Sequence, residues 1–207
     1  MLSVKFFTLT LILTSIFAVN VKDFGATGDG IIDDTVSVNN AITNITNNGG
    51  GKLYFPFGTY KVRNTLRISN VPVVITGDGV FLSKLFWNSD GTDGFLISVW
   101  NNMDFEVRDI SLHASTISGT AVVVNVTTAI KVKVKINING VDIGSTGIGP
   151  GWNGCVHLIN ATRIVLNQVN CIGTRDNLSF PTNNFGFKVT GTGAPVDVYL
   201  SQVRVSL

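Results

Sequence analysis

Four charged residues in the second half of the chain have side chains that can do acid–base chemistry: Asp109, Asp142, Arg175 and Asp176. Paired carboxylates can serve as general acid and general base at a glycosidic bond. A basic residue can instead remove the proton beside the carboxylate of an acidic sugar, with calcium held by acidic oxygens. Asp109 and Asp142 occupy comparable places in two successive repeat units. Stacking of the units is therefore expected to bring the four side chains onto one surface as a catalytic site.

The same residues fit a second interpretation, because aspartate is favoured in solvent-facing turns for its local hydrogen bonding. The chain contains a single glutamate, Glu106, so a carboxylate pair must come mainly from aspartates. His113 follows the strand that carries Asp109 and can titrate near neutral pH, or it can be an ordinary surface histidine. His157 is expected to face outward. No group of histidines and cysteines has metal-ligand spacing, so no metal site is predicted, and calcium enters only if the reaction is that of a lyase.

Three further residues suit the binding of a sugar polymer: Trp100, Lys133 and Trp152. Both tryptophans lie among glycine and amide residues at predicted turns, where an exposed ring can stack on a sugar. They can equally close a core. Lys133 is the centre of a stripe of three lysines that alternate with apolar residues, at positions 131, 133 and 135. Such a stripe can hold an acidic polysaccharide or be a solvated strand face.

The first third of the chain carries turn-forming and helix-capping residues. Glycines punctuate the polar segment 21–35, as tight turns with positive φ require. Asp33 or Asp34 can cap a helix that runs to about Asn47. The expected apolar face of this helix consists of Val36, Val38, Ala41, Ile42 and Ile45. Because a stack of coils must cover its end, this helix is expected to be the cap of a solenoid.

The segments Val21–Thr35, Gly49–Val62 and Ile75–Gly79 follow the order V-x-D-F-G-A-x-G-D-G-x-x-D-D-T, G-G-x-L-Y-F-P-x-G-x-Y-x-V and I-T-G-D-G. This order, over residues 19–79, resembles the N-terminal cap and first coils of the pectate-lyase superfamily, which includes rhamnogalacturonase-like, polygalacturonase-like and phage-tailspike domains. The resemblance implies an all-β fold, a single-stranded right-handed parallel β-helix with a short N-terminal capping helix. It also implies action on an acidic, pectin-like polysaccharide.

The polygalacturonase motifs are not found in this chain. Neither histidine lies in a Gly-His-Gly motif, Arg-x-Lys does not occur, and Gly91–Gly94 matches the Asn-Thr-Asp motif only in part. The resemblance therefore supports the fold without supporting polygalacturonase activity.

The residues beyond the cap predict the same fold independently. Short strands separated by Gly, Asn, Ser and Thr recur as pairs with offsets of roughly 25–34 residues, which is typical of solenoid repeats. Three stretches look like one turn-and-strand unit: Val107–Leu112, Asn139–Ile143 and Leu166–Cys171. Alternating residues of each unit are expected to be buried between neighbouring coils.

The two ends of the chain give expectations about export and assembly. Residues 1–18 have a lysine, an apolar run and a final alanine, which predict a secretory signal peptide and leave residues 19–207 as one domain. The protein is then secreted, without stable membrane association after cleavage. Cys155 and Cys171 can form one disulfide or pack as thiols. The chain stops within an alternating strand, which favours a truncated product or an end sealed by another subunit, such as a second copy.

Composition excludes partners that are selected by bulk charge. The formal net charge is +2 and only 14% of residues are charged, so no strongly basic face indicates nucleic acid. The sequence predicts a secreted lyase or glycoside hydrolase that acts on acidic polysaccharide. The alternative is a non-catalytic module: a polysaccharide-binding, adhesin-like or tailspike-like solenoid, or an inactive truncated remnant.

Overall fold

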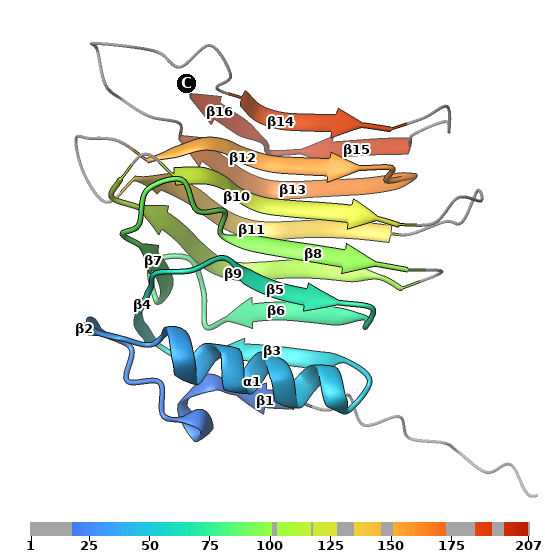
Figure 1. Cartoon of the computed structure of the whole chain (residues 1–207). Coiled ribbons are helices and arrows are strands. Elements are labelled where there is room, and N and C mark those ends of the chain that lie inside the picture. Colours follow the sequence, from blue (N-terminus) through green and yellow to red (C-terminus); the bar gives the residue numbers. More distant parts are fainter. Residues whose placement is uncertain are drawn as a thin grey trace, which may run out of the picture.

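The chain folds as a stack of coils in which every strand pairs in parallel with a strand of the next coil (Figure 1). The computed structural model describes residues 18–100, 103–116, 118–127, 135–145, 151–172, 185–191 and 197–206. The elements in chain order are β1 (Ala18–Asn20), η1 (Val21–Phe24), β2 (Asp29–Asp33), α1 (Thr35–Asn47), β3 (Gly51–Phe55), β4 (Gly58–Val62), β5 (Leu66–Ser69), β6 (Val73–Gly77), β7 (Ser83–Trp87), β8 (Phe95–Val99), β9 (Phe105–Ala114), β10 (Ser118–Val126), β11 (Lys135–Ser145), β12 (Trp152–Ile159), β13 (Arg163–Ile172), β14 (Phe185–Thr190), β15 (Asp197–Ser201) and β16 (Arg204–Ser206). The predicted parallel β-helix is confirmed.

Two sheets run along the stack. One has five strands in the order β14-β12-β10-β8-β5 and faces the viewer in Figure 1. The other has eleven strands, and its long members β9, β11 and β13 bend midway, so each coil presents two faces from this sheet. Each coil thus has three outer faces on which side chains can form a site.

The bend in the long strands uses one left-handed residue per coil. Asp109, Gly140, Gln168 and Gln202 have φ of 56°, 61°, 52° and 51° at this corner. Asn139, the residue before the bend in β11, pairs with Arg108 of β9 and with Asn167 of β13, which are the residues before the bend in those strands. The corners therefore stack directly on one another. The turn-and-strand unit predicted from the three similar stretches is confirmed.

The capping helix α1 lies across the first coil, as expected, but one residue of its predicted face is wrong. Val38, Ala41, Ile42 and Ile45 are buried, whereas Val36 is 71% exposed in the first turn. A position two residues before Val38 lies on the opposite side of a helix, so it cannot share the buried face.

Asp34 holds the cap together although its side chain does not cap α1. Its buried carboxylate accepts hydrogen bonds from the backbone N of Thr27 at 2.7 Å, from Oγ1 of Thr27 at 3.1 Å and from the backbone N of Gly28 at 3.2 Å. The helix therefore starts beside a turn that this aspartate orders.

The interior of each coil is apolar and contains the large aromatic rings. Trp87 contacts Phe95 and Trp152 edge to face, with ring centroids 5.8 Å and 5.3 Å apart. In the last coil the equivalent inward positions Val198, Leu200 and Val205 are 47%, 61% and 43% exposed. Whether a second copy covers them stays a prediction. No helix in the described ranges is long and apolar enough to cross a membrane.

Cys155 and Cys171 form a disulfide with 6.1 Å between their Cα atoms. The bond joins β12 to β13, so it crosslinks the two sheets through the buried interior. Of the two states left open by the sequence, the structure has the bridge.

Replacing both cysteines by alanine is expected to lower the free energy of unfolding by about 3 kcal/mol, because the bridge closes a loop of 16 residues in the unfolded chain. Urea denaturation of the variant and of wild-type protein with and without reductant measures the loss. Reduced wild type should unfold at nearly the midpoint of the double variant. An unchanged midpoint after complete reduction would contradict this role.

Candidate active site

The outer face of the five-stranded sheet carries a histidine beside a lysine. His157 on β12 and Lys188 on β14 are direct register partners, and both point outward because Val156 and Leu158 fill the interior. Nε2 of His157 lies 2.9 Å from Oγ1 of Thr190, which also belongs to β14. The outward orientation predicted for His157 is confirmed.

The surroundings of His157 favour its neutral form. Partial burial lowers its pKa below the ordinary value of 6.5, the positive charge of Lys188 lowers it further, and Asp93 opposes the shift. A neutral imidazole has a nitrogen lone pair that can accept a proton. At neutral pH this face therefore presents a base directly beside a cation.

The ring of Phe185 positions this pair. It lies edge to face with His157 at 5.9 Å between centroids, and Nζ of Lys188 lies 5.5 Å from its centroid. The ring can take this place because it packs on the bare Cα of Gly154, its register partner on β12. A methyl group at Gly154 would lie 2.3 Å from Cζ of Phe185.

Gly154→Ala is therefore expected to push Phe185 away from His157 and Lys188 and to raise the pKa of His157, since Lys188 loses the ring that holds it. A histidine titration followed by NMR measures the pKa. Gly91→Ala is the matched control, because a methyl group there meets nothing within 4 Å, although its φ of 70° adds strain. An unmoved His157 pKa in Gly154→Ala would show that Phe185 does not position the pair.

Asp93 supplies a carboxylate next to the same strands. Its Oδ1 accepts a hydrogen bond from the backbone N of Thr120 at 2.7 Å and lies over Gly119 at the start of β10. The negative charge of Asp93 opposes the lowering of the pKa of His157. The face thus carries a base, a cation and a carboxylate on β12, on β14 and just before β8.

Asp142 lies on another face, in the second half of β11, and pairs with a histidine. Its Oδ2 is 2.8 Å from Nε2 of His113, and its Oδ1 accepts a hydrogen bond of 2.6 Å from Nδ2 of Asn170. The side chains of His113 and Asp142 are 12% and 14% exposed. Nδ1 of His113 and Oδ1 of Asn170 are buried without a partner in the part of the chain that the structure describes.

The pKa of Asp142 is the result of opposing effects. Burial raises it, but the hydrogen bonds from His113 and Asn170 and the charges of His113 and Lys84 outweigh burial, so the pKa lies below the ordinary value of 3.8. The carboxylate stays charged, and each of its oxygens has one protein partner. This arrangement fits a structural pair better than a group that meets substrate.

The predicted pairing of Asp109 with Asp142 is wrong. Asp142 is level with Ser111 in the register, two residues beyond the bend at which Asp109 lies. Asp109 forms an ion pair with Arg108 instead, with Nη1 and Oδ2 3.1 Å apart and the aspartate side chain 43% exposed. The similar stretches suggested equivalent places because an aspartate occurs near the bend in both strands. In β9 the aspartate is the bend residue itself, Asp109, whereas in β11 it is Asp142, two residues after the bend at Gly140.

Trp152 is not a sugar-binding residue, contrary to the prediction. Its ring is fully buried, and Nε1 donates a hydrogen bond of 3.0 Å to the carbonyl oxygen of Leu112. Trp100 is 53% exposed directly after the end of β8. Its role in sugar binding stays a prediction.

Arg175, Asp176 and Lys133 lie outside the described residues, so their predicted roles stay predictions. Arg175 and Asp176 belong to the connection between β13 and β14, and Lys133 to that between β10 and β11. Among the described residues, no three histidine, cysteine, aspartate or glutamate side chains are close enough to hold a metal ion together.

Sequence reasoning missed Lys188, Phe185 and Thr190 as partners of His157. Alternation of polar and apolar residues along β12 places His157 outward, but its partners lie about one coil further on. Their identity depends on the register between β12 and β14, which the intervening connection obscures.

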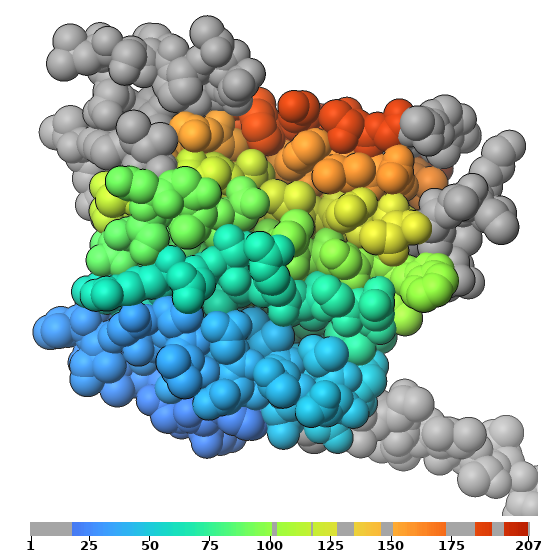
Figure 2. All heavy atoms as spheres, in the orientation of Figure 1, coloured from blue at the N-terminus to red at the C-terminus, as the bar shows by residue number. Residues whose placement is uncertain are grey.

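Figure 2 shows the face of the five-stranded sheet as a continuous surface in the orientation of Figure 1.

Comparison with known proteins places this chain among carbohydrate-active β-helices. Mannuronan C5-epimerase AlgE4 of Azotobacter vinelandii is 54% identical over 105 residues, which are 45% of this chain and 19% of the relative. Alginate lyase 7 of the same organism is 32% identical over 160 residues, 72% of this chain and 17% of the relative. The chain thus spans less than a fifth of these curated relatives.

Among solved structures, the A-module of mannuronan C-5 epimerase AlgE4 matches 90% of this chain and 73% of its own, with 16% identity and a TM-score of 0.36. The family model described as rhamnogalacturonase A/epimerase, pectate lyase-like, matches residues 18–191, from β1 to the residue after β14. The chain belongs to this rhamnogalacturonase A/epimerase family of pectate lyase-like proteins.

Proposed function

We propose that this protein acts on the uronate residues of an acidic polysaccharide by removing the proton at C5, next to the carboxylate. The observation that carries the proposal is the pair of His157 and Lys188 on neighbouring strands of one outer face. Removal of this proton needs a neutral base and a positive charge that stabilises the enolate-like intermediate. The lowered pKa of His157 and the adjacent ammonium group meet both needs.

The C5–H bond breaks as its proton passes to the imidazole, and Lys188 stabilises the negative charge that develops on the carboxylate. Two outcomes follow from this intermediate. Breaking of the C4–O bond, with a proton returned to the departing oxygen, gives an unsaturated sugar and is a lyase reaction. Delivery of a proton from water to the opposite face of C5, while the imidazolium releases its proton to solvent, gives the epimer. The two curated relatives, named for C5-epimerisation of mannuronan and for cleavage of alginate, are consistent with this shared first step.

Export of the protein is part of the proposal. The bridge between Cys155 and Cys171 is typical of an oxidising compartment, and the apolar segment at residues 6–17 supports a signal peptide. An extracellular polysaccharide is then the accessible substrate class. Digestion of the exported protein with a protease and identification of its N-terminal peptide test this proposal, because cleavage near residue 18 predicts that the peptide begins there.

The second candidate function is binding without chemistry. Trp100 favours it, since its exposed ring directly after β8 can stack on a sugar that the protein does not change. Both functions require that the protein binds a sugar, so a binding measurement alone does not separate them.

The test is incubation of the purified protein with polymannuronate, polyguluronate, polygalacturonate and a neutral glucan, each with calcium or with a chelator. Ultraviolet absorbance detects unsaturated ends, a reducing-sugar assay detects cleavage, and NMR measures the ratio of C5 epimers. Unsaturated ends establish a lyase, and an altered epimer ratio establishes an epimerase. Reducing ends without unsaturation would identify a hydrolase and contradict proton removal by His157. Binding without any product would favour the binding module.

A further inference from the structure

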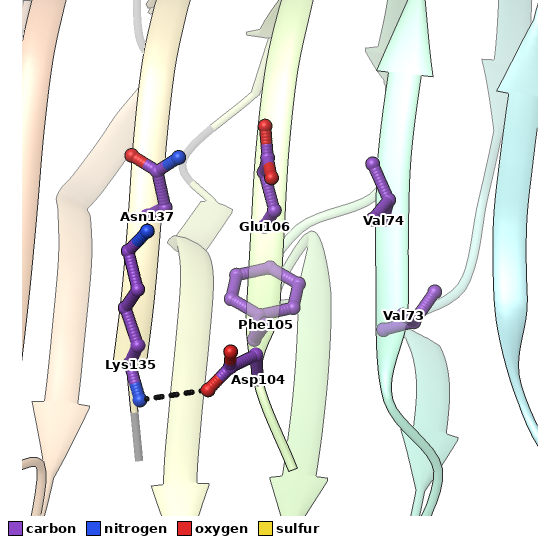
Figure 3. Close-up of a pocket in the computed structure, with 7 residues that line it drawn as sticks. All are labelled: Val73, Val74, Asp104, Phe105, Glu106, Lys135 and Asn137. Atoms are coloured by element: carbon purple, nitrogen blue, oxygen red, sulfur yellow. Dashed lines mark hydrogen bonds between the residues drawn. The ribbon is translucent and has the colours of Figure 1, made fainter. Parts of the chain in front are cut away.

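A cavity with both polar and apolar lining residues opens on a face of the coil that does not carry His157. It has a volume of about 70 Å³ and lies between β6, β9 and β11 (Figure 3). Val74 from β6 forms an apolar side of the cavity, and Glu106 and Asn137 face it from the two neighbouring strands. Three successive coils therefore contribute to one depression.

Two carboxylates at this cavity are held in place by the protein. Oδ1 of Asp104 accepts a hydrogen bond of 3.2 Å from the backbone N of Lys135, and Oε1 of Glu106 forms an ion pair of 3.1 Å with Nε of Arg108. A carboxylate has room for further donors at its remaining lone pairs. Both groups are thus oriented acceptors with capacity left.

Two donors line the same cavity, Nζ of Lys135 and the side-chain amide of Asn137. Neither has a hydrogen-bond partner among the residues that the structure describes. In Figure 3 the side chain of Lys135 runs along β11 toward Asn137, and both end on the same side of the cavity as the Glu106 carboxylate. Free donors and oriented acceptors therefore surround one small space.

The charges around the cavity do not favour an anion, because Arg108 is shared between Glu106 and Asp109 and leaves Lys135 as the cation of the lining against the carboxylates of Asp104 and Glu106. A uronate carboxylate placed here would meet two other carboxylates. A hydroxyl group both donates and accepts, so adjacent hydroxyls can donate to a carboxylate and accept from Lys135 or Asn137. The volume admits an edge of a sugar ring rather than a whole ring, and Val74 offers an apolar contact for its C–H groups.

We propose that this cavity is a second carbohydrate site, which binds two neighbouring hydroxyls of a neutral sugar residue. The choice of a sugar among polyols rests on the proposed function, but the site does not depend on the chemistry of His157. The site would hold a polymer or a branch on one face while the other face acts on uronate.

The test is an NMR titration of the isotopically labelled full chain with methyl α-mannopyranoside and, separately, with sodium mannuronate. The neutral glycoside is expected to shift the side-chain amide of Asn137 and the backbone amides of residues 104–106, with a dissociation constant of about millimolar. Mannuronate is expected to shift these signals far less. Asn137→Ala and Glu106→Gln should each weaken the neutral sugar about tenfold, as the loss of one or two hydrogen bonds predicts.

His157→Gln is the control, because it removes the proposed base and should leave this titration unchanged. Retained sugar shifts in His157→Gln together with lost activity would separate the two sites. The cavity proposal is overturned if methyl α-mannopyranoside shifts none of these signals, or if both cavity variants keep wild-type shifts while their thermal unfolding is normal. Stronger shifts with mannuronate than with the glycoside would also overturn it.

Discussion

Replacement of His157 by glutamine is expected to reduce the rate of C5 proton removal about 10²- to 10⁴-fold, the usual contribution of a general base. Glutamine keeps a polar side chain of similar reach on β12 but cannot accept the proton at neutral pH. The measurement is the steady-state rate on the best substrate of the uronate panel. The change should appear mainly in kcat, since Lys188 still binds the substrate carboxylate.

The pH profile separates a catalytic base from a residue that only supports the fold. A base is active when neutral, and the pKa of His157 lies below 6.5, so the wild-type rate should be constant at neutral pH and fall on acidification. Lys188→Met removes a charge that lowers this pKa, so the acid limb of the remaining activity should move to higher pH. Lys52→Met on β3, over the ring of Tyr54, is the matched control and should leave the profile unmoved. A His157→Gln protein with wild-type kcat would exclude His157 as the base.

Asp142→Ala is expected to lower the free energy of unfolding at pH 7 by about 3 kcal/mol. The substitution leaves His113 and Asn170 without the acceptor that both share in a largely buried place. Chemical denaturation measures the loss. Asp109→Asn is the control, because its ion pair with Arg108 is exposed and asparagine tolerates the left-handed bend, so the loss there should stay below about 1 kcal/mol.

The effect of Asp142 should also depend on pH with a defined sign. The folded-state pKa of Asp142 is lower than in the unfolded chain, so its stabilisation is fully present above about pH 4 and disappears as the pH falls through the folded-state pKa. The difference between wild type and Asp142→Ala should therefore shrink below about pH 4. A difference that stays constant down to the acid transition would contradict the charged state assigned to this carboxylate.

The fold was predictable because its determinants are local. Alternating apolar residues such as Ile136 and Ile138 decide which side of each strand is buried, and turn residues recur once per coil. The cap helix was predictable from its apolar spacing, apart from Val36. Trp152 was misassigned because its glycine-rich neighbours suggest a loop, whereas the ring completes the interior beside Trp87.

The candidate site was less predictable because it depends on register between coils. His157 meets Lys188 and Phe185 only through the pairing of β12 with β14, across about thirty residues of chain. Asp142 meets His113 in the same way, because Asp142 lies two residues after the bend at Gly140 and is therefore level with Ser111 rather than with the bend residue Asp109. Sequence similarity between repeats indicates the repeat, but a two-residue offset changes which side chains touch.

The most direct test of the central claim is incorporation of deuterium at C5 of uronate. The protein is incubated with the best uronate polymer in ²H₂O, and NMR of the recovered sugars follows the C5 proton together with unsaturated ends. Wild type is expected to lose the C5 proton signal by exchange, epimerisation or elimination, and His157→Gln to retain it under the same conditions. Retention of the C5 proton by wild type that cleaves the polymer would contradict the account, and so would equal loss with wild type and His157→Gln.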